Sequence, residues 1–135
     1  VGVLLEAAGG LKEGAKKVIA GGPMMGFAMY DLDVPTTKTT SAITCFLHDA
    51  VEESPSTACI NCGSCVNACS EGLVPARLSQ FAEKGDLETF VKWHGMECVE
   101  CGCCSYVCPA KRPLAQVIRN ARRMAMAARK KQGGR

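Results

Sequence analysis

Hydrophobic side chains recur at three- and four-residue intervals in the last quarter of the chain. This period is that of one face of an α-helix, so a long helix is predicted to begin at Pro113. Two shorter helices are predicted before it, over residues 75–84 and 87–94. Pro75 suits a first helical position, and Asp86 is a good N-cap. The predicted apolar face of the long helix consists of Leu114, Val117, Ile118, Ala121, Met124, Ala125 and Ala128.

The first part of the chain alternates between short helix-like and strand-like stretches. Residues 3–8 predict a short helix, and residues 18–20 predict a strand. Residues 34–47 are rich in threonine and β-branched side chains, which favours one extended strand or two short ones. The glycine-rich run 21–26 predicts a tight turn with two methionines, Met24 and Met25, packed inward. A loop that approaches a cofactor is the alternative for this run.

Composition limits the kind of protein this can be. The chain has 135 residues, a net charge of +3 and only 5% aromatic residues, so a purely organic core would be modest. It has no apolar stretch of about 18 residues, the length that spans a membrane. Ten cysteines without a visible signal peptide are typical of an intracellular protein. Because the chain opens at Val1 in a helix-like stretch, we expect it to be a fragment of a longer protein.

Eight of the cysteines form two runs with the same spacing, C-x2-C-x2-C-x3-C. This is the spacing of bacterial ferredoxin-type iron–sulfur ligation, and it predicts two [4Fe–4S] clusters. Gly63 and Gly102 fall inside the runs, where a positive φ is expected. In proteins with two such clusters, the fourth cysteine of each run binds the other cluster. The prediction is therefore one cluster on Cys59, Cys62, Cys65 and Cys108, and a second on Cys98, Cys101, Cys104 and Cys69.

Zinc sites and disulfides are the alternative uses of these cysteines. Zinc often binds C-x2-C pairs, but it has no need of the third and fourth cysteines of each run. Disulfides suit small secreted scaffolds, and many pairings here would be strained. Cys45 lies outside both runs and is predicted to be a small buried hydrophobe. Cys103 is predicted to be a spare thiol without a ligand role, and the alternative is that it tunes a cluster or substitutes as a ligand. We identify no catalytic residue.

The basic C-terminal part is predicted to present a solvated helix face. Contact with an anionic membrane surface or an acidic partner is the alternative. The stretch has no aromatic side chains for base stacking, which argues against nucleic-acid binding. Trp93 and Met96 are expected to pack over the second cluster. The basic residues are Arg119, Arg122, Arg123, Arg129, Lys130, Lys131 and Arg135.

Taken together, these motifs resemble the C subunit of the Rnf ion-translocating electron-transport complex. The likeness rests on G-G-P-M-M-G at 21–26, on V-P-T-T-K-T-T from Val34, on both cysteine runs and on residues 100–114. It implies a peripheral, cytoplasm-facing subunit of a membrane complex that moves electrons between NADH and ferredoxin, coupled to sodium or proton transport. It also implies that FMN and NADH bind only in an upstream domain that is missing here. Ser70 departs from the family, which usually has proline after the cysteine equivalent to Cys69.

The predicted fold class is α+β. The resemblance implies a partial β-grasp segment at the start, and the cysteine runs with their flanking helices predict an all-helical two-[4Fe–4S] ferredoxin domain after it. The predicted boundaries are 1–48 for the end of the β-grasp module and the return to the missing domain, 49–57 for a linker, 58–115 for the cluster domain, and 116–135 for a basic helix and tail. The predicted function is electron relay, with the other subunits of the complex as partners at the cytoplasmic face of the membrane. The alternatives are the iron–sulfur part of a cobalamin reductase of the propanediol-utilisation type and a zinc-stabilised interaction module.

Overall fold

The computed structural model describes residues 1–49 and 53–133, with side chains described as far as residue 131. These residues form two compact units, one ending at Ser54 and the other starting at Pro55. The predicted linker, 49–57, includes residues 50–52, which lie outside the described residues. The first unit contains a small sheet and the second is helical, which gives a mixed fold of helices and strands.

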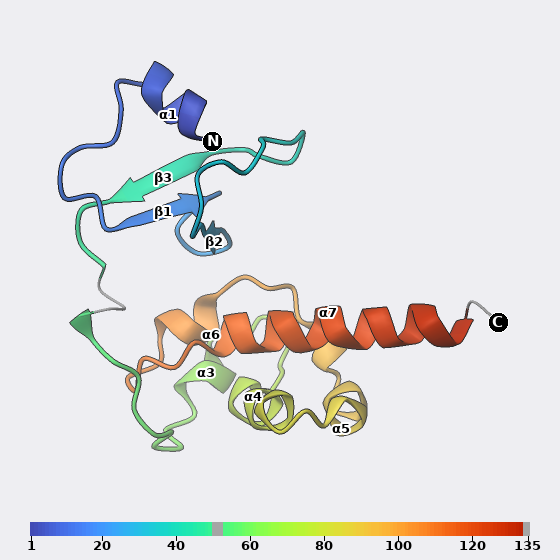
Figure 1. Ribbon diagram of the computed structural model, residues 1–135. Helices are drawn as coiled ribbons and strands as arrows, with labels where there is room; N and C mark the ends of the chain where they lie inside the picture. The colour runs from blue at the N-terminus through green and yellow to red at the C-terminus, as the bar shows by residue number, and fades with distance from the viewer. Residues whose placement is uncertain (50–52, 134–135) are drawn as a thin grey trace. The chain divides into compact units, whose positions relative to one another are not determined.

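The first unit is built on a small antiparallel sheet next to a short helix, α1 (Gly2–Ala7). Its described strands are β1 (Lys17–Ala20), β2 (Phe27–Ala28) and β3 (Ile43–Phe46), in the order β2-β1-β3 (Figure 1). Ile19 pairs with Ala28 on one side and with Thr44 on the other. Val18 and Ile19 supply the buried side chains of the central strand. The predicted helix and first strand are confirmed, while β2 was not predicted.

The predicted strand over residues 34–47 is mostly wrong. Only Ile43–Phe46 pairs as a strand, and residues 34–42 form loop and turn. Threonine side chains explain the difference. The Thr37 N–H donates to Thr40 Oγ1 at 3.0 Å, and the hydroxyls of Thr37 and Thr39 lie 2.9 Å apart. Local bonds of this kind compete with strand pairing, so a threonine-rich stretch can favour a turn over a ladder.

Two predictions about buried side chains in this unit are also wrong. Met24 and Met25 are exposed, at 49% and 56%, because the turn that carries them lies on the surface of the unit. Cys45 is exposed on the edge strand β3 rather than buried. The turn does need glycine at its end. A Cβ on Gly26 would lie 2.5 Å from both the Gly22 carbonyl oxygen and Ile19 Cγ2, which is too close for any side chain.

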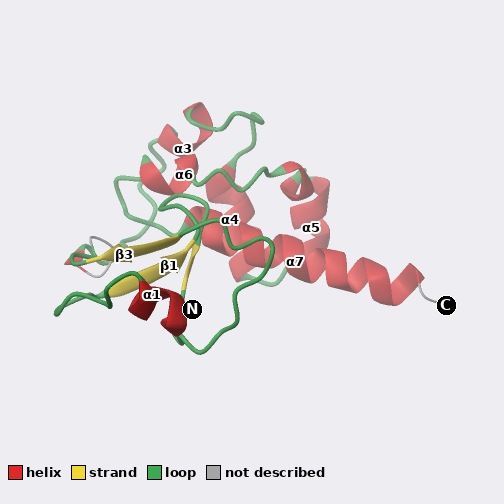
Figure 2. Cartoon of the chain, turned by 90° about the horizontal axis from the view of Figure 1, so that it is seen from above, coloured by secondary structure: helices red, strands yellow, loops and turns green. Residues whose placement is uncertain are grey.

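The described residues of the second unit form helices joined by loops, without a strand. Its long helix α7 packs against α4, α5 and α6 (Figures 1 and 2). Shorter helical segments accompany them: α3 precedes α4, while the 3-10 turn η1 and helix α6 lie between α5 and α7. The bounds are α3 (Ser64–Asn67), α4 (Pro75–Glu83), α5 (Leu87–Lys92), η1 (Gly95–Glu97), α6 (Cys103–Tyr106) and α7 (Leu114–Gly133). The helices predicted to begin at Pro75, Leu87 and Pro113 are confirmed to within a few residues.

Local capping explains where the middle helices begin and end. The Asp86 carboxylate accepts the Thr89 N–H at 3.0 Å, which satisfies one of the free donors at the start of α5. The Thr89 N–H also lowers the pKa of Asp86 below its ordinary value. The predicted end at His94 is too late. Helix α5 ends at Lys92, since His94 takes a left-handed conformation with φ of 59°.

The hydrophobic core of this unit lies where α4, α5 and α7 meet. Leu78 and Phe90 are 0% exposed, and Ile118 is 1% exposed. The predicted apolar face of α7 is only partly buried, because Met124 is 57% exposed and Ala128 is exposed as well. Trp93 does not pack as predicted either. It is 45% exposed and lies against Phe81, with ring centroids 5.4 Å apart.

Gly95 lies against the fully buried ring of Phe90, and this contact generates a stability prediction. A Cβ at position 95 would overlap the Phe90 ring, so Gly95→Ala should lower the free energy of unfolding of the helical unit by about 1–3 kcal/mol. Urea unfolding followed by circular dichroism measures the change. Gly22→Ala is the control, because a Cβ there meets nothing within 4 Å. Equal stability of both variants would contradict the packing of Gly95 on Phe90.

Candidate functional site

Both cysteine runs fold in the same way. Before the second cysteine of each run lies a left-handed residue, Asn61 with φ of 55° or Glu100 with φ of 59°. After it lies a left-handed glycine, Gly63 with φ of 78° or Gly102 with φ of 82°, as predicted. The glycine caps a four-residue helix, α3 or α6. The chain therefore turns sharply around the second cysteine and carries the third one, on the short helix, into the interior.

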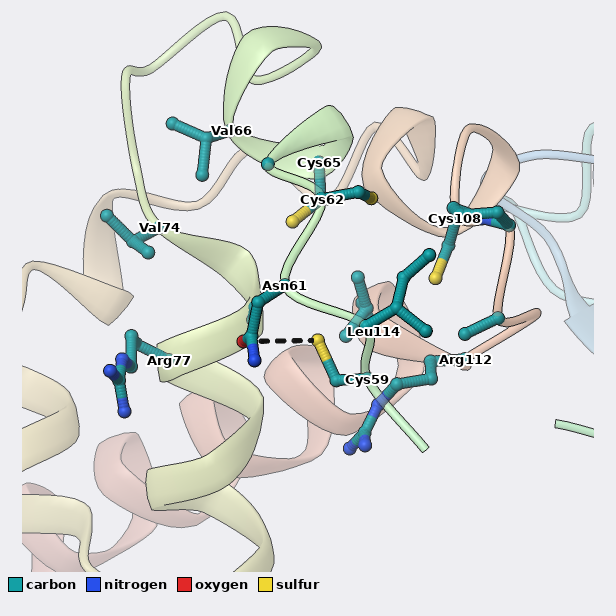
Figure 3. A pocket seen from close by; sticks show the side chains of 15 residues that line it. Cys59, Asn61, Cys62, Cys65, Val66, Val74, Arg77, Cys108, Arg112 and Leu114 are labelled. Atoms are coloured by element: carbon teal, nitrogen blue, oxygen red, sulfur yellow. Dashed lines mark hydrogen bonds between the residues drawn. The ribbon is translucent and has the colours of Figure 1, made fainter. Parts of the chain in front are cut away.

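The first cysteine cavity takes thiols from both runs. Its volume is about 160 Å³, and the side chains of Val74 and Leu114 line it together with the cysteines. Figure 3 shows the Sγ atoms of Cys59, Cys62 and Cys108 turned toward the space between the segments that carry them. The four cysteines that line this cavity are Cys59, Cys62, Cys65 and Cys108.

The second cysteine cavity also takes thiols from both runs. Its volume is smaller, at about 20 Å³, and Leu73, Leu78 and Ile118 form part of its wall. The structure thus gathers the eight predicted residues into two groups of four, each drawn from both runs. Cys103 is not among the lining residues of either cavity. The cysteines of this second group are Cys69, Cys98, Cys101 and Cys104.

The fourth cysteine of each run packs in the same hydrophobic cluster as a cysteine of the other run. Cys108 is buried with Cys65, Cys104 and Leu114. Cys69 and Cys98 both pack against the core around Leu78 and Ile118, as Met96 does. A backbone hydrogen bond of 2.9 Å from the Thr57 N–H to the Ala110 carbonyl joins the start of the first run to the end of the second. Crossing of the two runs is therefore a property of the packing of this unit.

The donor set fits an iron–sulfur cluster. Within the described residues, no three His, Cys, Asp or Glu side chains are gathered as tightly as a single metal ion requires. Each set of four thiols instead surrounds a cavity with mainly apolar walls. Four cysteine thiolates around a common space are the ligands of a [4Fe–4S] cluster. The residues present could hold such a cluster in either cavity.

The thiols differ in how easily they lose a proton. Hydrogen bonds from the Ser64 hydroxyl and N–H lower the pKa of the exposed Cys62. Burial raises the pKa of Cys104 to about 11, with a further contribution from the Cys98 thiolate. Burial likewise raises the pKa of Cys98, although the Glu100 N–H, 3.4 Å from its Sγ, acts in the opposite direction. A hydrogen bond with Cys101 raises the pKa of Cys103.

An ion-pair cluster next to the second cavity was not predicted. Arg119 and Arg122 of α7 both bind the carboxylate of Glu100 and are largely buried, with 12% and 22% of their side chains exposed. The prediction of a solvated helix face is therefore wrong for these two arginines. The available signal was a carboxylate inside a cysteine run and two arginines three residues apart on one helix face.

The comparisons with known proteins agree with this geometry. A family model described as a 4Fe-4S dicluster domain matches residues 58–111. The C subunit of the Na⁺-translocating ferredoxin:NAD⁺ oxidoreductase complex of Acetobacterium woodii is 38% identical over 128 residues, which cover 95% of this chain. Over nearly its whole length the chain is therefore similar to Rnf C subunits.

Two further relatives have names of the same kind. The C subunit of the proton-translocating ferredoxin:NAD⁺ oxidoreductase complex of Clostridium ljungdahlii is 41% identical over 59% of the chain. The C subunit of the ion-translocating oxidoreductase complex of Methanosarcina acetivorans is 37% identical over 86% of the chain. The chain spans only 29%, 18% and 26% of the A. woodii, C. ljungdahlii and M. acetivorans proteins. Among the helices of the described residues, none is both long enough and apolar enough to cross a bilayer.

The difference in thiol pKa predicts an order of alkylation. In protein stripped of iron under conditions that keep its helical circular dichroism signal, iodoacetamide should modify Cys62 first and Cys104 last. The reactive form is the thiolate, which is favoured at Cys62 by Ser64 and disfavoured at Cys104 by burial. Mass spectrometry of a time course at mildly alkaline pH measures the order. Equal rates at the two thiols would contradict the site as described.

Proposed function

We propose that this chain is the electron-relay portion of an Rnf C subunit and carries two [4Fe–4S] clusters. The observation that carries the proposal is the grouping of eight thiols, four around each of two cavities, with each group drawn from both cysteine runs. The matches to a 4Fe-4S dicluster domain and to the C subunits of ferredoxin:NAD⁺ oxidoreductase complexes support it.

The proposed ligands follow the two cavities. When bound, each cluster supplies a reversible one-electron carrier. The protein binds it through thiolates, excludes water with apolar walls such as Leu78, Leu114 and Ile118, and directs N–H groups at sulfur, as Glu100 does at Cys98. The first cluster is assigned to Cys59, Cys62, Cys65 and Cys108, and the second to Cys69, Cys98, Cys101 and Cys104.

The electron source and destination lie outside this chain. Electrons would pass between an upstream domain that binds FMN and NADH and the ferredoxin side of the complex, coupled to ion translocation. The names of the relatives support this role, since they are subunits of Na⁺- or proton-translocating ferredoxin:NAD⁺ oxidoreductase complexes. The proposed partners are the other subunits of the complex. The proposed location is a peripheral one at the cytoplasmic face of the membrane.

The two alternative functions are less well supported. The relatives are named as C subunits of ion-translocating complexes, which favours the Rnf function over a cobalamin reductase. A zinc-stabilised interaction module is disfavoured by the 4Fe-4S dicluster match over residues 58–111.

Pairs of cysteine variants in the full-length subunit test the crossed assignment. Cys59→Ser and Cys108→Ser remove ligands of the same proposed cluster. The double variant should lose no more iron and sulfide than either single variant. That loss is about half of the iron and sulfide of two clusters. The double variant Cys59→Ser with Cys69→Ser should lose both clusters. Iron and sulfide analysis with EPR spectroscopy of the reduced protein measures the loss.

The control for this experiment is Cys103→Ser, which should keep both clusters because Cys103 lines neither cavity. The opposite pattern would refute the crossed assignment. In that pattern, Cys59→Ser with Cys69→Ser leaves one cluster, and Cys59→Ser with Cys108→Ser leaves none.

A further inference from the structure

The two cysteine runs differ at one equivalent position. Asn61 and Glu100 each precede the second cysteine of their run, and both are left-handed. The Asn61 side chain stays within its own loop, where Oδ1 lies 3.8 Å from Cys59 Sγ (Figure 3). The Glu100 side chain leaves its loop and binds α7. The second loop is therefore tied to the long helix by a contact that has no counterpart at Asn61.

The contact is a two-point ion pair. Arg119 Nε donates to Glu100 Oε2 at 2.7 Å, and Arg122 Nη1 donates to Glu100 Oε1. Each carboxylate oxygen thus has its own guanidinium, and the Glu100 side chain is only 21% exposed. Because a planar guanidinium binds in a fixed direction, two of them leave the carboxylate little rotational freedom.

The same contact stabilises an unusual backbone conformation. A glutamate in the left-handed region is strained, unlike glycine, and less readily accommodated there than asparagine. In this conformation the Glu100 N–H donates to Cys98 Sγ at 3.4 Å. Anchoring the side chain to α7 holds the residue, and with it the direction of its N–H. The ion pairs therefore act on the sulfur of Cys98 through the backbone of Glu100.

We propose that Arg119 and Arg122 are positioning residues which, through Glu100, hold an N–H on Cys98 Sγ and raise the reduction potential of the cluster on Cys98, Cys101, Cys104 and Cys69. This rests on the proposed function, because it requires that cluster. Reduction adds one electron to the cluster, and no covalent bond of the protein forms or breaks. An N–H directed at sulfur stabilises the added negative charge, so losing it lowers the potential.

Net charge would also alter the potential, so the test keeps it constant. Glu100→Gln with Arg122→Gln removes one negative and one positive charge and breaks both ion pairs. EPR-monitored titration of the full-length subunit with dithionite measures the midpoint of each cluster. We expect the reduced-to-oxidised ratio of one cluster at fixed potential to fall about tenfold, a shift of about 59 mV for a one-electron couple. The midpoint of the other cluster should not change.

Two single variants complete the assignment. Arg123→Gln removes a charge from an exposed neighbour on the same helix and should leave both midpoints unchanged. Asn61→Asp adds a negative charge beside Cys59, so it should lower the midpoint of the other cluster and thereby identify it. Two unchanged midpoints in the double variant, with both clusters present, would overturn the proposal. A wild-type subunit without iron and sulfide would instead refute the proposed function.

If the double variant loses a cluster, a milder variant tests the same proposal. Arg122→Lys keeps the charge but replaces the planar fork with a single ammonium group. We expect a lower midpoint of the second cluster and, in pulsed EPR after exchange into D₂O, a weaker coupling to the exchangeable N–H deuteron. If the coupling and the midpoint both equal those of the wild type, Arg122 does not position Glu100.

Discussion

Paired left-handed residues around the second cysteine of each run are the constraint on which the site depends. They reverse the backbone so that the first three thiols of a run line one wall of a cavity. Each left-handed residue other than glycine costs about 1–3 kcal/mol, and Gly63 and Gly102 avoid that cost. Asn61 tolerates the conformation. Glu100 adopts this conformation less readily than asparagine, and its two ion pairs to α7 hold it there.

Helix α7 links both cavities to the hydrophobic core. Leu114 lines the first cavity, Ile118 lines the second, and Arg119 and Arg122 hold the second cysteine loop. The helix is fixed at its start by a side chain of the second run, since the Ala115 N–H donates to Ser105 Oγ at 2.9 Å. The same apolar face thus stabilises the helical unit and supplies part of the apolar wall of both cavities.

Local patterns were sufficient to predict most of the helical unit. Proline at the start of α4, the Asp86 cap and the cysteine spacing each act over a few residues, so they can be recognised without the fold. The failures depend on contacts that the linear pattern does not specify. The bonds of Thr37 replaced a strand with a turn, and the Cys45 side chain is exposed although its strand pairs within the sheet. The ion pairs of Glu100 join residues 19 and 22 positions apart.

The central claim is that each of the two groups of four thiols binds an inorganic cluster. Chemical analysis of the anaerobically purified full-length subunit for iron, acid-labile sulfide and zinc tests this most directly. The account predicts equal amounts of iron and sulfide, sufficient for two [4Fe–4S] clusters per chain, with no zinc bound by these cysteines. A folded subunit that contains zinc without sulfide, or enough iron and sulfide for only one cluster, would contradict it.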